Sequence, residues 1–271
     1  MNYFKILVTI MFLIFSLVSI SVGYEGVSEG ESGGIPEGIG EPKVKVALVH
    51  YPPYTIQNET AEHSGMVYDL LKSISNLDVV FMPPKRAMEE YKRANVDLLL
   101  FSDVGAYSVF KKSSKFLPLF QGNTYLIYIK TSNNNGVLTK ENLSNKAVAV
   151  IRGVDSEAKE LRLLGLDVIE VENLEQSLKM LALNRIEYSN MSLLPFQFHL
   201  KSMQNKSIYD FSKEPTFLLN VGLFYRKNSE GHVISVVNEI AKSYLSDRYY
   251  SIINKYITSD QQVMDYLPNQ K

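Results

Sequence analysis

The side chains that most often perform chemistry are sparse in this chain and do not fall at catalytic spacings. Of its 271 residues none is cysteine, so thiol catalysis, disulfides and cysteine zinc sites are excluded. The four histidines, no two of which have the short spacing of a metal-binding pair, are His50, His63, His199 and His232. Ser108 and Lys111 have the spacing of a penicillin-recognising nucleophile motif, but its Ser-Asp-Asn and Lys-Thr-Gly partners are absent. The sequence therefore predicts no catalytic nucleophile, no metal site and no bound cofactor.

Two arginines are better candidates for contact with a ligand. Arg86 begins a predicted helix soon after a strand, and Arg152 ends another strand directly before Gly153. An arginine at such a place can hold a carboxylate, phosphate or sulfonate through two parallel hydrogen bonds. The alternative is that each arginine pairs with a neighbouring Asp or Glu at the surface, where most arginine side chains lie.

Charge and composition narrow the class of partner. The chain is 45% hydrophobic and 21% charged, as in ordinary globular proteins, and its net charge of -1 gives no basic surface for nucleic acid. Its 28 basic and 29 acidic residues are unevenly placed, since Lys5 and the five glutamates of residues 24–42 precede the main body. The body from Lys43 onward is therefore about +3, which mildly favours a small anion as ligand.

The first 42 residues differ from the rest of the chain. Residues 1–23 are typical of an export signal, because Lys5 precedes an apolar run over 6–22 and Ser21-Val22-Gly23 offers a small-x-small cleavage site. That run is near the lower limit for a spanning helix, so an uncleaved N-terminal anchor stays open. Residues 24–42 are rich in Gly and Glu and predict a flexible acidic linker. We therefore expect the remainder in the periplasm or on the outer face of the cell membrane.

Hydrophobic periodicity from Lys43 onward predicts strands that alternate with helices. The expected strands are 43–51, 78–82, 96–101, 125–129, 146–151, 167–171, 186–191 and 221–226. The expected helices are 65–77, 86–94, 156–164, 174–184 and one or two within 233–257, with Asp155 or Ser156 as the N-cap of the third. Two successive βαβαβ units predict an α/β protein with two lobes and a cleft between them.

Several short motifs occur in the order that one protein family shares. They are Tyr51-Pro-Pro-Tyr54, Gly65-Met-Val-Tyr-Asp69-Leu-Leu, Pro84-Lys-Arg86-Ala87 with Val96-Asp97, Ala149-Val-Ile-Arg-Gly153 and Val221-Gly222-Leu-Phe-Tyr-Arg226-Lys227. Over residues 43–260 the chain resembles a divergent branch of the type II periplasmic solute-binding proteins, extracellular solute-binding protein family 3. The resemblance implies the two-lobed type II periplasmic-binding-protein fold, with hinge strands between the lobes. Lobe 1 would comprise residues 43–126 and 218–271, and lobe 2 residues 127–217.

The resemblance also implies a function and a binding site. Such proteins capture a small molecule by lobe closure and deliver it to the membrane permease of an ABC transporter, so we expect a non-enzymatic, monomeric binding protein. The ligand-binding residues would be Tyr51, Tyr54, Arg86, Ser102, Asp103, Arg152, Gly153, Asp155, Ser156 and Ser192. Tyr51 would stack on the ligand, and backbone N–H groups at the helix that follows Gly153 would hold its anionic end. Tyr51 or Tyr54 could instead pack on its own lobe.

The chain departs from the amino-acid binders of this family at two positions. The arginine that clamps an α-carboxylate falls at Val109, and the aspartate that receives an α-ammonium falls at Ser192. If the alignment with the family were shifted by one or two residues, Asp103 or Glu187 could take one of these two roles. The departures predict that the solute is not a standard α-amino acid, and the two arginines favour an organic acid or another small anion.

Two other functions stay open. An enzyme on the same fold, such as a periplasmic dehydratase, would need a general acid or base in the cleft, and Asp103, Asp155 and Glu187 are the candidates. A sensing module would pass closure to a partner receptor on another chain.

Overall fold

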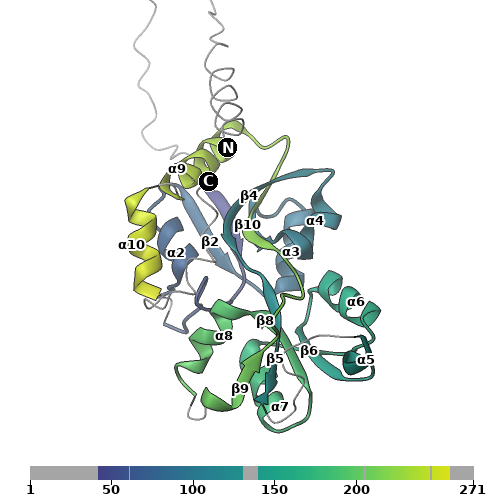
Figure 1. The fold of residues 1–271 in the computed structure, drawn as a ribbon. Helices are drawn as coiled ribbons and strands as arrows, with labels where there is room; N and C mark the ends of the chain where they lie inside the picture. The colour runs from purple at the N-terminus through teal and green to yellow at the C-terminus, as the bar shows by residue number, and fades with distance from the viewer. Residues whose placement is uncertain (1–41, 61, 131–139, 204–205, 245, 257–271) are drawn as a thin grey trace, which may run out of the picture. The chain divides into compact units, whose positions relative to one another are not determined.

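The structure is a computed structural model that describes residues 42–60, 62–130, 140–203, 206–244 and 246–256. Within these residues ten strands form two five-stranded mixed sheets (Figure 1). The first has the order β2-β1-β3-β10-β4 and the second the order β7-β6-β8-β5-β9. In each sheet the first three strands are parallel and the fourth is antiparallel to the third. The two sheets confirm the expected α/β fold of two lobes.

The elements of the first sheet come from both ends of the described chain. Its strands are β1 (Val44–Leu48), β2 (Leu77–Phe81), β3 (Leu98–Ser102), β4 (Ser114–Gln121) and β10 (Asn220–Arg226). Its helices are α2 (Met66–Leu71), α3 (Pro84–Lys92), α4 (Asp103–Phe110), α9 (Gly231–Tyr244) and α10 (Asp247–Tyr256).

The second sheet is built from one continuous stretch. Its strands are β5 (Thr124–Ile129), β6 (Ala147–Ile151), β7 (Asp167–Val171), β8 (Tyr188–Ser192) and β9 (Tyr209–Phe211). Its helices are α5 (Lys140–Leu143), α6 (Asp155–Leu163), α7 (Leu174–Ala182) and α8 (Leu193–Leu200), and a short 3-10 helix covers Lys206–Ile208. The expected lobe boundary between residues 126 and 127 falls inside β5, which belongs as a whole to this sheet.

Alternate residues of the central strands face opposite helical layers. Val46 and Leu48 of β1 belong to the cluster that includes α2, α9 and α10, whereas Ala47 between them packs with Ala87 and Tyr91 of α3. Figure 1 shows α2 and α10 on one side of the first sheet and α3 with α4 on the other. A strand buried on both faces is apolar at nearly every position, as β3 (LLLFS) is, whereas β1 (VKVAL) keeps one half-buried lysine, Lys45.

The chain crosses between the lobes twice, at residues 121–124 and 212–220. The two crossovers pair with each other, since Gly122 N donates to Leu219 O at 2.9 Å and Thr124 N to Phe217 O at 3.0 Å. A Cβ at Gly122 would lie 2.7 Å from Leu219 Cδ1, so a larger residue there would have to displace that side chain. The crossovers thus form a two-stranded hinge. We propose that the boundaries between the two lobes lie at these crossovers and not at residues 126 and 217.

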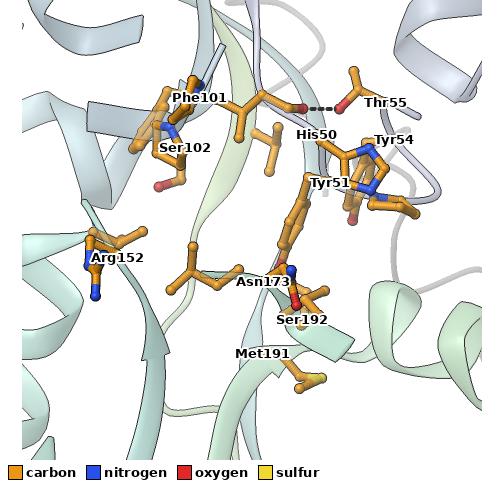
Figure 2. Close-up of a pocket in the computed structure, with 18 of the residues that line it drawn as sticks. His50, Tyr51, Tyr54, Thr55, Phe101, Ser102, Arg152, Asn173, Met191 and Ser192 are labelled. Atoms are coloured by element: carbon orange, nitrogen blue, oxygen red, sulfur yellow. Dashed lines mark hydrogen bonds between the residues drawn. The ribbon is translucent and has the colours of Figure 1, made fainter. Parts of the chain in front are cut away.

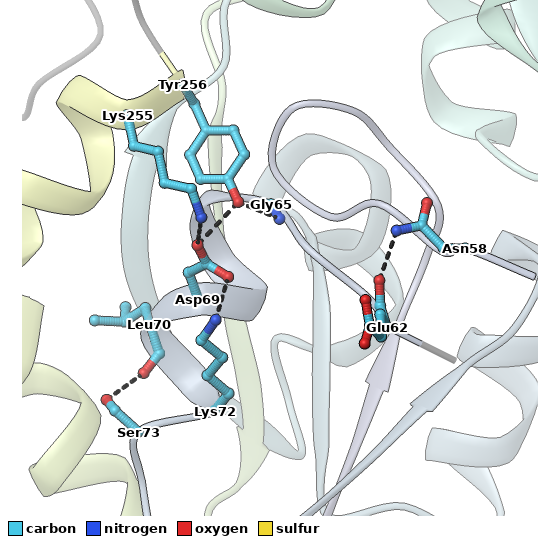
Figure 3. A network of polar contacts seen from close by, with 9 residues as sticks. All are labelled: Asn58, Glu62, Gly65, Asp69, Leu70, Lys72, Ser73, Lys255 and Tyr256. Carbon is cyan, nitrogen blue, oxygen red and sulfur yellow. Dashed lines mark hydrogen bonds and ion pairs between the residues drawn. The ribbon is translucent and has the colours of Figure 1, made fainter. Parts of the chain in front are cut away.

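A buried carboxylate fixes the C-terminal helix to the first lobe (Figure 3). Asp69 of α2 pairs with Lys72 at 3.0 Å and accepts hydrogen bonds from Lys255 Nζ at 2.8 Å and Tyr256 Oη at 2.9 Å. The Tyr256 hydroxyl also accepts from Gly65 N at 2.9 Å. Burial alone would raise the pKa of Asp69, but the donors from Lys255, Lys72 and Tyr256 outweigh it and lower the pKa. The carboxylate is therefore ionised and holds α10 against α2.

Five helices and strands were not expected from the sequence, and one helix cap was misplaced. The unexpected elements are α4, β4, α5, α8 and β9, together with the 3-10 helix over Lys206–Ile208. The N-cap of α6 is Val154, without a side-chain hydrogen bond, and not Asp155 or Ser156, because the helix begins at Asp155.

The N-terminal expectations concern a part that the structure does not cover. The signal or anchor at 1–23 and all of the linker but Pro42 lie outside the described residues. Among the helices of the described ranges, none combines the length and the apolar character needed to cross a membrane.

Candidate functional site

A cavity of about 620 Å³ lies between the two sheets, at the carboxyl ends of their parallel strands. Its lining includes Val49 after β1, Ser102 at the end of β3, Ile151 at the end of β6 and Ser192 at the end of β8. The hinge contributes Thr124 and Leu219, and β10 contributes Val221. Open α/β sheets bind ligands beyond the carboxyl ends of their strands, so the topology itself places this cavity.

The lobes make contacts across the cavity mouth that only a closed arrangement permits. Gly153, with φ +92°, lies so close to the start of α3 that a Cβ there would be 3.1 Å from Lys85 N. Helix α4 of the first lobe also packs against α6 of the second. The lobes therefore touch each other in the described structure, an arrangement that we call closed.

Tyr51 spans the cleft from the first lobe. Its backbone is held by hydrogen bonds with Thr55 that close the loop after β1, and its ring reaches toward Ser192 of the second lobe (Figure 2). The Tyr51 hydroxyl is hydrogen-bonded to Ser192, while burial raises the pKa of Tyr51 to about 12. Tyr54 stacks parallel to Tyr51, with ring centroids 5.8 Å apart, and is buried against Phe120. Tyr51 thus presents its ring to the cavity, and Tyr54, which also lines the cavity, stacks against it.

The two arginines do not supply a buried cation. Arg152 lines the cavity, but its side chain is 57% exposed and its guanidinium pairs with Glu172 and, at 3.7 Å, with Glu170. Arg86 is exposed on α3 and does not line the cavity, whereas its neighbour Lys85 does. Arg152 thus matches the alternative of surface ion pairing, and Arg86 is an exposed residue outside the cavity lining.

The remaining expected residues divide between the cavity and its surroundings. Ser102 and Ser192 line it, and Ser192 Oγ donates to Gly122 O in the hinge at 2.7 Å. Those outside the lining are Asp103, Gly153, Asp155 and Ser156. Asp103 instead ties α4 to β10, accepting from Asn220 N at 2.8 Å and from Asn220 Nδ2 at 2.9 Å.

Of the positions considered for an amino-acid clamp, Ser192 lies in the cavity lining and the others lie outside it. Val109 is 46% exposed on α4 and is not part of the lining. Glu187, the possible substitute, accepts from Ala147 N at 2.8 Å at the start of β6. Neither Asp103 nor Glu187 reaches the cavity, so the structure offers no replacement for the missing clamp at these positions.

One acid of the site with a strongly raised pKa was not expected from the sequence. Glu157, in the first turn of α6, is 8% exposed and lines the cavity, and Asn190 Nδ2 of β8 donates to its Oε2 at 3.0 Å. Burial raises the pKa of Glu157 to about 7, although the hydrogen bond from Asn190 opposes the rise. The sequence signal was weak, because a glutamate in the first turn of a helix is ordinarily exposed there.

A pair of histidines flanks the cavity from opposite lobes. Burial lowers the pKa of His199, although nearby Glu175 raises it, and the same two causes act on His50. His199 Nδ1 lies 3.4 Å from Glu175 Oε1, and His50 Nδ1 accepts from Gln57 N at 3.0 Å. Both imidazoles are therefore neutral at pH 7. In the part of the chain that the structure describes, no group of three or more His, Asp or Glu side chains could hold a metal ion.

Comparison with known proteins identifies the architecture. No model of a protein family matches the sequence, and no curated protein matches it. Among solved structures, the GluR0 ligand-binding core in complex with L-glutamate aligns with a TM-score of 0.67 at 16% identity, over 81% of this chain and 99% of that one. The fold is that of the type II periplasmic binding proteins.

Two further structures share this periplasmic-binding-protein fold. The substrate-binding protein of an amino acid ABC transporter aligns with a TM-score of 0.66 at 16% identity, over 80% of this chain and 99% of that one. A mutant of ArgBP from T. maritima aligns with a TM-score of 0.64 at 18% identity, over 79% of this chain and 94% of that one. At such identities the likeness establishes the fold.

Proposed function

We propose that this chain is an extracytoplasmic solute-binding protein of the family 3 type. It would capture a small molecule between its lobes and present it to the permease of an ABC-type transporter. The observation that carries the proposal is the cavity of about 620 Å³, lined by both lobes and by the hinge. Sites for small molecules typically measure about 300–1,000 Å³.

The interlobe contacts support a function based on closure. Tyr51 and Ser192 meet across the cleft, and Gly153 lies against Lys85, so the closed form gains contacts that an open form lacks. A solute that touches both lobes binds the closed form more tightly and shifts the equilibrium toward it. A permease that recognises the surface of the closed form would then distinguish the solute-bound protein from the free one.

The nature of the solute follows from what the cavity lacks. An α-amino-acid clamp of the family type is missing, with Val109 outside the cavity and Ser192 uncharged. We therefore retain the proposal that the solute is not held as a standard α-amino acid. The expected anionic solute rested on Arg86 and Arg152, one outside the cavity and the other paired with Glu172, so the geometry does not support it.

A second candidate function is catalysis on the same fold. Of the general acids considered from sequence, Asp103, Asp155 and Glu187 all lie outside the cavity lining, whereas Glu157 lies within it. A carboxyl with a pKa of about 7 is suited to proton transfer at neutral pH, which favours this candidate specifically. We rank it second, because the solved structures that share the fold and are cited above are described as binding proteins and ligand-binding cores.

The test is native mass spectrometry of the purified full chain, followed by titration with the solute that co-purifies. A bound mass that is released unchanged and rebinds with lobe closure supports a binding protein, which we propose acts as a monomer. Conversion of that mass to a product supports the enzyme. Loss of solute uptake on deletion of the gene supports a transporter, whereas intact uptake with a lost response to the solute supports a sensing module.

A further inference from the structure

Glu157 is a buried carboxylate whose charge the protein does not neutralise. Within the described residues its Oε2 accepts one hydrogen bond, from Asn190 Nδ2 at 3.0 Å, and its Oε1 accepts none. A buried charge is stable only when it is paired or well hydrogen-bonded. Since Glu157 lines the cavity, a solute can supply the missing partner.

The one donor to Glu157 is held in a fixed orientation by the hinge. The Thr216 hydroxyl donates to Asn190 Oδ1 at 2.7 Å and lies 3.0 Å from the Thr124 hydroxyl. Asn190 is 5% exposed, so its amide has little freedom and its Nδ2 stays directed at Glu157. Thr124 and Thr216 belong to the two crossovers, which links this carboxylate to the element that moves on closure.

The charged residues around the cavity also favour a positively charged partner for Glu157. Four of the lining residues are acidic and two are basic, namely Glu59, Glu157, Glu172, Glu175, Lys85 and Arg152. Glu172 neutralises Arg152, and Lys85 is exposed at the start of α3. The buried part of the lining therefore contains a carboxylate and no cation among the described residues.

Two further groups are suited to a positively charged partner. His199 Nδ1 lies 3.4 Å from Glu175 Oε1, and a proton on Nδ1 would favour this contact and leave Nε2 as an acceptor. His199 Nε2 is buried without a hydrogen-bond partner in the described residues. The Tyr51 ring offers an aromatic face within the same cavity, and such faces attract ammonium and guanidinium groups.

We propose that Glu157 binds a cationic group of the solute, an ammonium or a guanidinium, and is the main determinant of solute charge. This inference rests on the proposed function, since it assigns the ligand class of the same cavity. It reverses the role expected for this end of α6, where backbone N–H groups were to hold an anion. The solute would be a small organic cation, or a molecule that buries its cationic end beside Tyr51.

Proton linkage gives the inference a distinctive signature. A cation requires ionised Glu157, whose pKa in the free protein is raised by burial to about 7. The affinity should be full near pH 8 and fall roughly tenfold by about pH 6, as the free carboxyl becomes protonated. A neutral solute that accepts a hydrogen bond from protonated Glu157 would give the opposite slope. Tyr51, the other titratable group that faces Glu157, has a pKa of about 12 and stays neutral throughout.

The experiment is calorimetric titration of the full chain with pairs of probes matched in size but not in charge. L-arginine is compared with L-citrulline, and 1,4-diaminobutane with 1,4-butanediol, at about pH 6 and pH 8; succinate is the anionic probe. We expect a cationic member to bind more tightly than its neutral partner, and Glu157→Gln to weaken it by roughly ten- to a hundredfold. Glu160→Gln, an exposed change on the same helix, should leave binding unchanged.

The variant also isolates the pH effect. His50 and His199 can protonate near pH 6. Any pH dependence of the affinity that remains in Glu157→Gln is therefore due to these histidines, and the part that is lost is due to Glu157. Circular dichroism checks that the variant is folded. If the variant does not fold, the pH dependence of the affinity in the unmodified chain still tests the inference.

Three results would overturn the inference. They are a neutral or anionic probe that binds as tightly as the cationic one, a cation affinity that Glu157→Gln leaves intact, and an affinity that rises as the pH falls. In these cases binding with closure would still stand, so the proposed function survives. If no probe binds and no mass co-purifies, the inference and the proposed function both fail.

Discussion

Asp69 shows how one buried carboxylate can fix a helix that is distant in sequence. Asp69→Asn removes the charge that Lys72 and Lys255 face, while the side-chain volume is kept. Both lysines are more than half exposed, so water screens most of each ion pair, and we expect a loss of about 1–2 kcal/mol in the free energy of unfolding. Urea unfolding of the variant and the unmodified chain measures it.

The pH dependence and a matched pair provide the controls. Because the pKa of Asp69 is lowered on folding, its contribution is present above the unfolded value of 3.8 and is lost as the pH falls below it. Glu89 and Lys92 form an exposed pair with the same i,i+3 spacing, so Glu89→Gln should leave the free energy of unfolding unchanged. Equal effects of the two substitutions would contradict a special role for Asp69.

Glu157 should have the opposite linkage. Its pKa is raised from 4.5 to about 7, so the solute-free protein loses stability as the pH rises through this range. At about pH 8, Glu157→Gln should therefore be more stable than the unmodified chain, by about 2–3 kcal/mol, and the difference should shrink toward pH 4.5. Thermal unfolding across this range checks the sign. A variant that is destabilised at pH 8 would show that the ionised carboxylate is already compensated.

Residue types alone could identify part of the site. Tyr51, Ser102, Arg152 and Ser192 line the cavity as expected, because each follows a strand whose apolar run is clear in the sequence. Glu157 could not be found in this way, since burial of a first-turn glutamate depends on the distant Asn190 and on lobe closure. The specific partner of Arg152 could not be found in this way either, because Glu172 is close only once β6 and β7 pair in the folded sheet.

At the level of elements, a glycine at the start of α6 allows the lobes to close. Gly153 and Gly165 both have positive φ, +92° and +88°, so alanine at either should cost about 1 kcal/mol of stability. Only Gly153 faces the other lobe, where a Cβ would lie 3.1 Å from Lys85 N. Gly165 faces Ser144 of its own lobe at 3.5 Å, an ordinary contact.

Gly153→Ala should therefore weaken solute binding by roughly tenfold, whereas Gly165→Ala should lower the melting temperature without changing the affinity. Titration with the solute that co-purifies measures the effect of the contact with Lys85 on affinity. Thermal unfolding of each variant measures the cost of a positive φ at alanine. Equal affinities in the two variants would mean that α3 and Gly153 do not meet when the solute is bound.

Elements with a clear periodicity were predicted well, and those without one were missed. β7 has the bounds expected from sequence, β1 and β6 lie within theirs, and β5 begins one residue before its expected start, because alternation and short apolar runs define strands. Helix α4 begins directly after β3, so no turn residues mark its start. Helix α8 has the sequence LLPFQFHL, apolar on most sides and with Pro195 inside, so no amphipathic stripe reveals it.

At the scale of the whole described chain, closure links features that are far apart in sequence. The Glu157–Asn190 contact joins α6 to β8, and Thr216 and Thr124 carry the chain of hydrogen bonds into the hinge. Gly122, which lies in the first crossover, also accepts from Ser192 Oγ through its carbonyl oxygen. The hinge, the cavity wall and the interlobe contacts therefore change together when the lobes move.

This closed arrangement can be trapped covalently, because the chain contains no cysteine of its own. A Cβ at Gly153 would lie 3.4 Å from Lys85 Cβ, near the short end of the ~3.5–4.5 Å range that disulfides span. Oxidation of a Gly153→Cys, Lys85→Cys variant should join the lobes, and faster with solute than without it, since the solute favours the closed form. The cross-linked protein should retain solute that was bound beforehand and exclude solute added afterwards.

A second cysteine pair separates closure from simple reactivity. Gly165→Cys with Ser144→Cys brings two Cβ atoms to 3.8 Å within one lobe, so its oxidation rate should not respond to solute. Non-reducing electrophoresis over a time course of oxidation measures both pairs. If the interlobe pair forms no faster with solute than without, or if the cross-linked protein still exchanges solute freely, lobe closure around this cavity is not the binding step. A solute-dependent rate in the interlobe pair alone would tie binding directly to the contact between Gly153 and α3.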